Sequence, residues 1–171
     1  MELSQAIEKI LPSFEQYYTV KKESDPPFCA EAEFRSHNEQ YFLVRSAHIA
    51  DIDSNEFVFF ASVPLLDSSN FEPMTVLAWE KGLARVKPYN GHRNSDVTLI
   101  IVAEKIDEEI KKQIKKIKYY KSYKFSLHGW SHFKLAVVEL NTQDIYFNRF
   151  GKDYKKLLEK NIFQNPIGGK K

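Results

Sequence analysis

The sequence has little cysteine and little glycine, and each shortage excludes a class of site. Cys29 is the only cysteine, so the chain has no internal disulfide bond and no zinc ribbon or redox motif built on cysteine pairs. Only six of the 171 residues are glycine, and no glycine-rich turn stands where a phosphate-binding loop needs one. The Gly-x-Ser-x-Gly pattern of many serine hydrolases is also missing. No pattern indicates a cofactor, and we expect none.

Long apolar runs and a signal peptide are missing too. No apolar run approaches the ~18 to 20 residues that a membrane-spanning helix requires. The first nine residues include Glu2 and Glu8, whereas a signal peptide carries basic residues in this region. These absences predict a cytoplasmic protein without a membrane partner.

The composition is typical of one globular domain. Apolar residues make up 43% of the chain and charged residues 28%. A chain of this length can bury roughly 70% of the surface that its unfolded form exposes. The aromatic share of 14%, mostly phenylalanine and tyrosine, favours β-strands. We expect a single α+β domain over residues 1–163 and a frayed C-terminal tail over residues 164–171.

The spacing of apolar residues predicts ten elements in the order αβββαβαββα. A period of three to four residues predicts a helix, and a period of two predicts a strand. The expected helices cover residues 3–18, 71–86, 107–118 and 153–160, and Pro12 is expected to kink or divide the first of them. The expected strands cover residues 28–35, 40–49, 57–63, 97–103, 133–138 and 145–149.

The order of these elements predicts how they pack. Runs of strands separated by helices are typical of α+β proteins. We expect one mixed, mostly antiparallel sheet of about six strands, with helices mainly on one face. Residues 57–63 are apolar at nearly every position, so this strand is expected in the centre of the sheet with both faces covered.

Residues 110–138 form the most unusual stretch of the chain. Eight lysines and no acidic residue lie in it, so it carries a charge of +8, whereas the whole chain carries +2 and the remaining residues therefore −6. Six aromatic residues are interleaved with the lysines. The candidate ligand-binding residues of this basic segment are Lys111, Lys112, Lys115, Lys116, Lys118, Lys121, Tyr119, Tyr120, Tyr123, His128 and Trp130.

Two interpretations of the basic segment stay open. Cations interleaved with rings are typical of surfaces that bind nucleic acid, where lysines contact phosphate and rings stack on bases. The lysines equally fit the solvated face of an amphipathic helix, because the four isoleucines between positions 106 and 117 form an apolar stripe. Nucleic-acid binding requires that the lysines and the rings share one exposed face.

The end of the basic segment resembles a known protein family. It contains Lys124, Phe125, Leu127, His128, Gly129 and Trp130, followed by a strand over residues 135–140 and by Gly151 and Lys152. A Lys-x-Phe-x-Leu-His-Gly-Trp box after a lysine-rich helix resembles an uncharacterised family of short proteins found mainly in Clostridia and related bacteria. The chain departs from this box at one place, since no lysine stands two residues before Phe125. The resemblance implies a bacterial cytoplasmic protein and no particular activity.

His128 and His132 are the candidate metal ligands. They lie four residues apart, so in an extended segment both side chains point to the same face and are able to share a metal ion or a proton. The alternative is structural. Gly129 then permits a tight turn, Trp130 covers the edge of the core, and His128 caps a carbonyl group.

An enzymatic alternative comes from the order of the elements. The first six follow the order αβββαβ of the PD-(D/E)XK nucleases, in which two carboxylates hold magnesium and a lysine activates water. Glu31, Glu33 and Arg35 share one face of an expected strand, but an arginine does not readily release a proton. No acid-x-lysine pattern follows in the central strand, and element order alone is weak evidence for a reaction.

Three hypotheses of function follow from these patterns. The preferred one is a non-enzymatic interaction protein that binds a protein partner or a second copy of itself. The second is a nucleic-acid-binding module that uses residues 111–130. The third is a metal-dependent hydrolase or nuclease-like enzyme that combines His128 and His132 with the acids of residues 31–53. We assign no catalytic residue.

Overall fold

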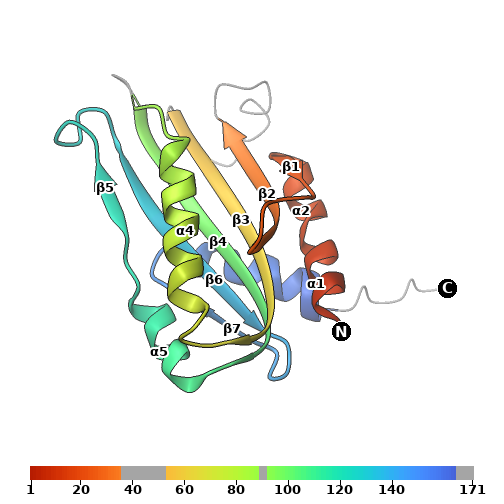
Figure 1. Ribbon diagram of the computed structural model, residues 1–171. Helices are drawn as coiled ribbons and strands as arrows, with labels where there is room; N and C mark the ends of the chain where they lie inside the picture. Colours follow the sequence, from red (N-terminus) through yellow and green to blue (C-terminus); the bar gives the residue numbers. More distant parts are fainter. Residues whose placement is uncertain (36–52, 89–91, 165–171) are drawn as a thin grey trace.

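One mixed β-sheet forms the centre of the protein, and helices cover both of its faces (Figure 1). The computed structural model describes residues 1–35, 53–88 and 92–164. The order of the strands across the sheet is β1-β2-β3-β4-β6-β5, with β7 paired to β6. The strands are β1 (Thr19–Lys21), β2 (Phe28–Arg35), β3 (Asp53–Leu66), β4 (His92–Ile106), β5 (Tyr120–Ser122), β6 (Trp130–Glu139) and β7 (Asp144–Phe147).

The strand pairs are parallel in the middle of the sheet and antiparallel around it. β3 pairs with β4 and β4 with β6 in parallel. α4 (Phe71–Ala84) returns the chain to the start of β4, and α5 (Glu108–Lys116) followed by β5 returns it to the start of β6. The pairs β1–β2, β2–β3, β5–β6 and β6–β7 are antiparallel. The predicted α+β fold with a mixed, mostly antiparallel sheet is therefore confirmed.

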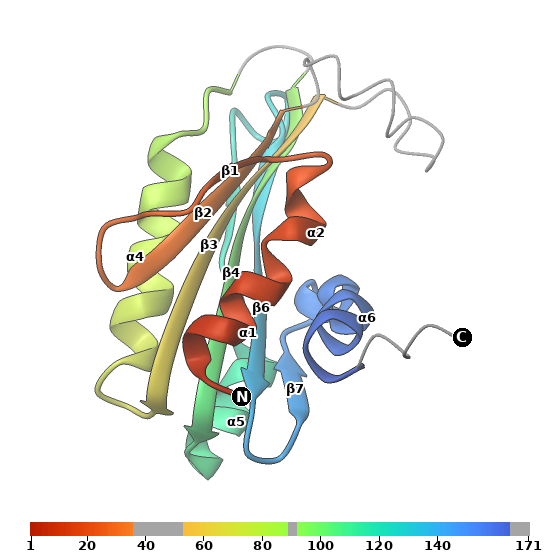
Figure 2. The ribbon, with the colours of Figure 1, turned by 90° about the vertical axis from the view of Figure 1, so that its right-hand side faces the viewer.

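The helices lie on both faces of the sheet, which corrects the expectation that they lie mainly on one. α4 and α5 pack on one face, and α1 (Leu3–Ile10), α2 (Pro12–Glu15) and α6 (Lys155–Leu158) pack on the other (Figure 2). β3 explains the second layer. Phe57 and Phe59 lie in the core under α4, Val58 and Phe60 lie in the core under α1, and all four are buried. A strand that is apolar on both faces needs cover on both.

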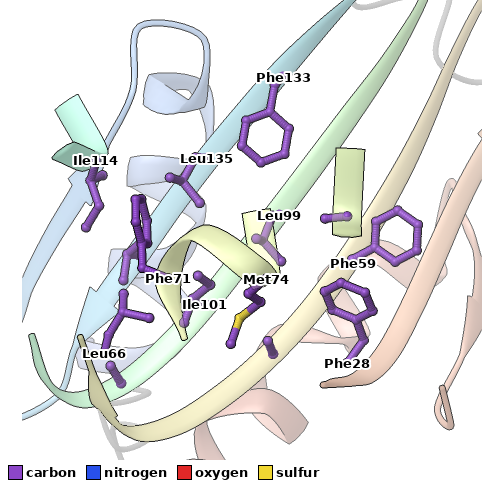
Figure 3. Packing of buried hydrophobic residues seen from close by; sticks show 14 of the residues in the cluster. Phe28, Phe59, Leu66, Phe71, Met74, Leu99, Ile101, Ile114, Phe133 and Leu135 are labelled. Atoms are coloured by element: carbon purple, nitrogen blue, oxygen red, sulfur yellow. The ribbon is translucent and has the colours of Figure 1, made fainter. Parts of the chain in front are cut away.

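Close packing of α4 on the sheet makes this scaffold rigid. Met74 and Phe71 of α4 belong to one buried cluster with Phe59, Leu99 and Ile101 of the central strands (Figure 3). Full burial of one such side chain contributes about 1.5–3 kcal/mol relative to leaving it in water. The parallel strands are therefore held in a fixed register, and side chains at their ends keep fixed positions.

The ends and interruptions of the helices follow local signals in the sequence. Pro12 divides the first predicted helix into α1 and α2. α5 begins with Glu108 and Glu109 and ends with Lys115 and Lys116, the order that the helix dipole favours. The last helical segment combines a 3₁₀ turn (Gly151–Tyr154), α6 and a π turn (Glu159–Phe163).

Some predicted elements differ from the structure or lie outside the described residues. β1 and β5 have three mostly exposed residues each, too few to show an apolar period, and the sequence does not predict them. The predicted strand over residues 40–49 and the predicted tail from residue 165 onward lie outside the described residues. Within residues 1–35, 53–88 and 92–164, no helix is long and apolar enough to cross a membrane.

Asn148 closes a gap along the outer edge of β6. β5 pairs with residues 130–132 of β6 and β7 with residues 136–139, so the Phe133 carbonyl and the Leu135 amide face no strand. Asn148 Nδ2 donates to the Phe133 carbonyl at 2.8 Å, and Asn148 Oδ1 accepts from the Leu135 N–H at 2.9 Å. The carboxamide thus replaces a peptide group of the missing strand and fixes the backbone on either side of Lys134.

Candidate functional site

The sheet face under α1, α2 and α6 turns from apolar to charged near the start of the parallel strands. Glu56, Asp96 and Lys134 carry this charge. Each stands two positions before a buried residue, namely Val58, Thr98 and Ala136 in the same order. Because side chains two residues apart share a face of a strand, these charges lie on the α1 side of the sheet. The register places Glu56 beside Asp96, and Thr98 beside Lys134. Three strands therefore bring two carboxylates and one ammonium group together.

A cavity of about 320 Å³ lies over these charges, and we call it the acidic pocket. Tyr17 and Tyr18 follow α2, Phe34 comes from β2, and the other lining residues come from β3, β4 and β6. The described lining residues are Tyr17, Tyr18, Phe34, Ser54, Asn55, Glu56, Asn94, Asp96 and Lys134.

Glu56 is the most strongly bound carboxylate of the acidic pocket. Its Oε2 accepts a hydrogen bond of 2.6 Å from the Tyr18 hydroxyl, and its Oε1 accepts from the Thr98 hydroxyl at 2.6 Å and from the Tyr154 hydroxyl. Burial opposes the charge of Glu56, but Lys134 and the three hydroxyl groups outweigh burial and hold the pKa of Glu56 below its ordinary value. A carboxylate offers about four acceptor positions. Three hydroxyl groups fill three of them, and Lys134 lies 3.6 Å away as an ion pair, so Glu56 is held as a structural anion.

Asp96 differs from Glu56 because its hydrogen bonds are longer. Asn94 Nδ2 donates to Asp96 Oδ2 at 3.2 Å, and the backbone N–H of His132 donates to Asp96 Oδ1 at 3.3 Å. With Lys134 these are three donors from the described residues, so about one acceptor position is left. Burial, together with the nearby Glu56, raises the pKa of Asp96 even though Lys134 opposes the rise. Asp96 is the carboxyl group that an incoming hydrogen-bond donor is able to reach.

Lys134 lies between the two carboxylates. Its Nζ is 3.2 Å from Asp96 Oδ2 and 3.6 Å from Glu56 Oε1. Burial disfavours the ammonium charge, but the two carboxylates outweigh burial and raise the pKa of Lys134 to about 12. A lysine with this pKa stays charged at neutral pH and cannot act as a general base there. When all three groups are ionised, the described lining residues of the pocket carry a net charge of −1.

Aromatic rings and carboxamides form the walls around this charge. The Tyr18 ring lies 5.5 Å from the Phe34 ring, and Tyr17 lines the same cavity. Ring faces carry partial negative charge, so rings of this kind attract cations. Asn55 and Asn94 add polar groups at the rim. An anionic floor between rings favours a ligand that is positively charged and partly apolar.

The local sequence patterns do not reveal the acidic pocket. The sequence nevertheless contains one signal for it: charged residues stand at strand positions whose neighbours two residues away are apolar or buried. Glu56 directly precedes the apolar run 57–63, and Lys134 stands between Phe133 and Leu135. The pocket becomes visible only when the parallel register brings Asp96 between them.

The lysines of the basic segment have two different environments. Lys111 is held by Glu108 at 2.8 Å and by Glu139 at 3.0 Å, and its side chain is largely buried. Lys112 lies 3.8 Å from Glu109 on the exposed surface of α5. The other candidate lysines, which are all exposed, are Lys115, Lys116, Lys118 and Lys121.

The aromatic candidates of the basic segment do not share one face. Tyr119 packs in the core, with its ring 5.0 Å from Phe133, whereas Tyr120 is half exposed on the opposite side of the sheet. The Tyr123 hydroxyl lies 2.9 Å from the Ser131 hydroxyl. Trp130 and His128 are half-buried. Among the candidate tyrosines, Tyr120 presents most ring surface to solvent.

The two histidines and the acids of β2 lie apart. The His132 ring lies 5.2 Å from the Tyr120 ring, and its Nδ1 is buried without a hydrogen-bond partner in the described part of the chain. Glu31 lies on the other face of the sheet, where it binds Arg85 at 2.6 Å. Glu33 binds Arg35 beside it. Alternation along β2 directs the side chains of Glu31 and Glu33 toward α4. The hydrolase hypothesis is therefore wrong in combining these two acids with His132.

A metal centre also finds no support in the described residues. In residues 1–35, 53–88 and 92–164, no three side chains of histidine, cysteine, aspartate or glutamate are placed to hold a metal ion. The acids at positions 51 and 53 have side chains outside the described part of the structure. Glu56, although beside Asp96, already accepts hydrogen bonds from three hydroxyl groups and forms an ion pair with Lys134.

Comparison with known proteins places the chain in a family. A family described as a domain of unknown function, DUF8052, matches residues 2–160. The chain belongs to the DUF8052 family. No curated protein and no solved structure matches it.

The DUF8052 match covers every residue that lines the acidic pocket. It also covers the basic segment, and Tyr154, which binds Glu56 from the far end of the chain. The expectation of an uncharacterised family is thereby confirmed, while the match carries no activity to this member.

Proposed function

We propose that this DUF8052 protein is a non-enzymatic binding protein that holds a small organic ammonium ion in the acidic pocket. The observation that carries the proposal is the unequal charge on the pocket floor, where among the described lining residues Glu56 and Asp96 face one cation, Lys134. A buried excess of negative charge is costly unless a cation neutralises it. A ligand that brings one positive charge supplies this neutralisation.

The hydrogen-bond pattern supports an ammonium group with N–H donors. Asp96 has about one acceptor position left, and an N–H donor from a ligand fills it with a charge-assisted hydrogen bond. The apolar part of the ligand then lies against Tyr17, Tyr18 and Phe34. A volume of about 320 Å³ is at the lower end of the range of ligand pockets, so the ligand is small.

The same contacts support binding without catalysis. Glu56 has a lowered pKa and Lys134 stays charged at neutral pH, so neither group is suited to accept a proton from a substrate. Asp96 remains as a single carboxylate without a second free acid or base beside it among the described lining residues. This arrangement is suited to holding a cation in place.

Calorimetric titration with benzylamine, putrescine and the neutral analogue benzyl alcohol tests the proposal. We expect both amines to bind and benzyl alcohol to bind at least about tenfold more weakly, since it lacks the charge. Asp96→Asn should weaken amine binding at least about tenfold, equivalent to about 1.4 kcal/mol. Affinity should also fall on acidification, beginning at a higher pH than for an ordinary aspartate, because the pKa of Asp96 is raised and only its ionised form attracts the ligand.

Glu109→Gln is the matched control, because Glu109 is an exposed acid of α5 far from the pocket lining. Asp96→Asn should fold normally, since burial makes the charge of Asp96 unfavourable in the native state and the amide removes it. Equal binding of benzyl alcohol and benzylamine, or unchanged affinity in Asp96→Asn, would contradict the proposal.

Nucleic-acid binding through phosphate contacts alone is a second candidate function. The lysines on α5 are exposed, whereas the rings needed for stacking on bases do not share one face. Lys115 and Lys116 are exposed and make no ion pair within the described residues. Anisotropy of a labelled single-stranded oligonucleotide at several salt concentrations tests this candidate. We expect steeply salt-dependent binding that is lost when Lys112, Lys115 and Lys116 are changed to glutamate, because each lost phosphate contact removes close to one unit of salt slope. Absence of binding at low salt would leave these lysines as a solvated helix face.

We also propose that the protein works in the bacterial cytoplasm. The resemblance of the box from Lys124 to Trp130 to a mainly clostridial family supports this location. A protein partner or self-association stays a prediction.

A further inference from the structure

Two apolar side chains protrude from the loop that joins β5 to β6. This loop, residues 123–129, is called the β5–β6 tip and lies at one end of the sheet (Figure 1). Phe125 has 98% of its surface exposed and Leu127 has 74%. Exposed loops normally carry polar side chains, and large apolar groups in water mark interaction sites when they occur together.

The backbone of the β5–β6 tip holds these side chains outward. Tyr123 N–H donates to the Gly129 carbonyl at 2.9 Å, and Leu127 N–H donates to the Lys124 carbonyl at 3.0 Å. Lys124, Phe125 and Ser126 have φ angles of 46°, 52° and 67°. Residues other than glycine adopt this left-handed backbone region at a cost in free energy. Residues with such strained backbone angles concentrate at binding sites. The tip is an ordered turn with its apolar side chains directed into solvent.

Positively charged residues accompany the protruding side chains in the sequence. Lys124 directly precedes Phe125, Lys121 lies in β5 just before the tip, and both lysines are exposed. No acidic residue occurs in the sequence from residue 110 to 138. A partner of the tip must therefore offer negative charge at its surface and an apolar interior within reach of two side chains.

We propose that the β5–β6 tip inserts Phe125 and Leu127 into the surface of an anionic lipid bilayer. Apolar side chains beside lysines are typical of interfacial anchors, in which the apolar groups enter the acyl boundary and the lysines bind anionic headgroups. The aliphatic Leu127 enters hydrocarbon but has no ring to stack on a base, which favours lipid over nucleic acid. The lysines of α5 lie at the opposite end of the sheet from the tip, so they belong to a separate surface (Figure 1).

This contact needs no membrane-spanning helix. The expectation of no membrane partner rests on the absence of a long apolar run, and two inserted side chains do not require one. Neither Phe125 nor Leu127 lines the acidic pocket. The lipid contact and amine binding can therefore fail or succeed independently.

Co-sedimentation with vesicles tests this proposal. We expect the full chain to bind vesicles of phosphatidylglycerol and phosphatidylcholine, and to bind vesicles of phosphatidylcholine alone much more weakly. The double variant Phe125→Ser with Leu127→Ser should lose at least about tenfold in affinity, because the apolar groups supply most of the insertion. Lys121→Gln and Lys124→Gln should each lose about fivefold, the effect of one basic residue near an anionic surface.

Val76→Ser is the matched control, because Val76 is an exposed apolar residue on α4. Circular dichroism of each variant shows whether the fold is kept, and both tip residues are solvent-exposed, so we expect it to be kept. Unchanged sedimentation of the double variant would overturn the proposal. Binding of a single-stranded oligonucleotide but not of vesicles, lost in the double variant, would overturn it in favour of nucleic acid.

Discussion

Lys134→Met is expected to lower the free energy of unfolding by about 3–5 kcal/mol at neutral pH. Lys134 is the cation that compensates two carboxylates, and both of these are largely shielded from water. Removing one partner of a buried ion pair leaves the other charge without compensation, which costs more than the pair contributes. Methionine fills a similar volume, so the loss reports charge and not a cavity. Urea unfolding measures the change.

Two further measurements separate the charge effect from general damage at this position. In Lys134→Met the pKa of both carboxyl groups rises in the folded state, so the folded variant takes up protons that the unfolded chain does not. Its stability should therefore approach that of the original protein as the pH falls from 7 toward about 5. Adding Glu56→Gln removes one uncompensated charge and should restore part of the loss.

Lys155→Met is the matched control for Lys134→Met. Lys155 forms a half-exposed ion pair with Glu159 at 3.6 Å within the last helical segment. An exposed pair of this kind contributes about 0.5 kcal/mol or less. A loss in Lys134→Met no larger than that in Lys155→Met would mean that the charges of the acidic pocket are not coupled as their positions imply.

Asn148→Ala is expected to be the second large effect, with a loss of about 3 kcal/mol or more in the free energy of unfolding. The Asn148 carboxamide bonds to the Phe133 carbonyl, the Leu135 amide, the Gly151 amide and the Ile117 carbonyl. Each buried polar group left without a partner costs about 1–3 kcal/mol. Alanine leaves several such groups at once, and no strand is paired to β6 at this point to replace them.

Asn161→Ala is a suitable comparison for this variant. Asn161 Nδ2 makes one hydrogen bond, at 2.7 Å, to the Leu157 carbonyl. Loss of one partly exposed hydrogen bond should cost about 1 kcal/mol. Amide hydrogen exchange provides a second readout, since the Leu135 N–H should exchange faster in Asn148→Ala. Equal losses in the two asparagine variants would show that the carboxamide does not replace a strand.

Much of the fold can be predicted from local patterns. The alternation over residues 28–35 and the apolar run over residues 57–63 predict β2 and the centre of β3, because burial on one or both faces leaves a clear period. Pro12 and the charge order of α5 predict helix ends, because these signals act within one turn. The helix layers are harder to predict, since the apolar period shows that a helix is buried on one side but not which face of the sheet it covers.

The acidic pocket depends on long-range pairing that no local pattern contains. Glu56, Asp96 and Lys134 lie about forty residues apart in sequence, and the parallel register alone makes them neighbours. Tyr154 reaches Glu56 from 98 residues away. The basic segment shows the reverse case. Its lysines stand out in the sequence, yet Lys111 is held by Glu139 of β6, and Tyr119 packs against the core while its neighbour Tyr120, the first residue of β5, is half exposed.

The response of Asp96 to an added cation distinguishes a structural ion cluster from a binding pocket. In a purely structural cluster its acceptor positions are used inside the protein, and added amines leave it unaffected. In a binding pocket its remaining acceptor position faces the ligand, so its titration responds to an added cation. The two possibilities predict different behaviour of one carboxyl group.

The pKa of the Asp96 carboxyl group should be measured by carbon NMR, without and with saturating benzylamine, and assigned by the loss of its signal in Asp96→Asn. We predict a pKa above the ordinary value of about 3.9 in the free protein, because the carboxyl is buried beside Glu56. We predict that benzylamine lowers this pKa, because a neighbouring cation stabilises the ionised form. A pKa that is ordinary in the free protein and unchanged by benzylamine would contradict the assignment of the acidic pocket as a cation-binding site.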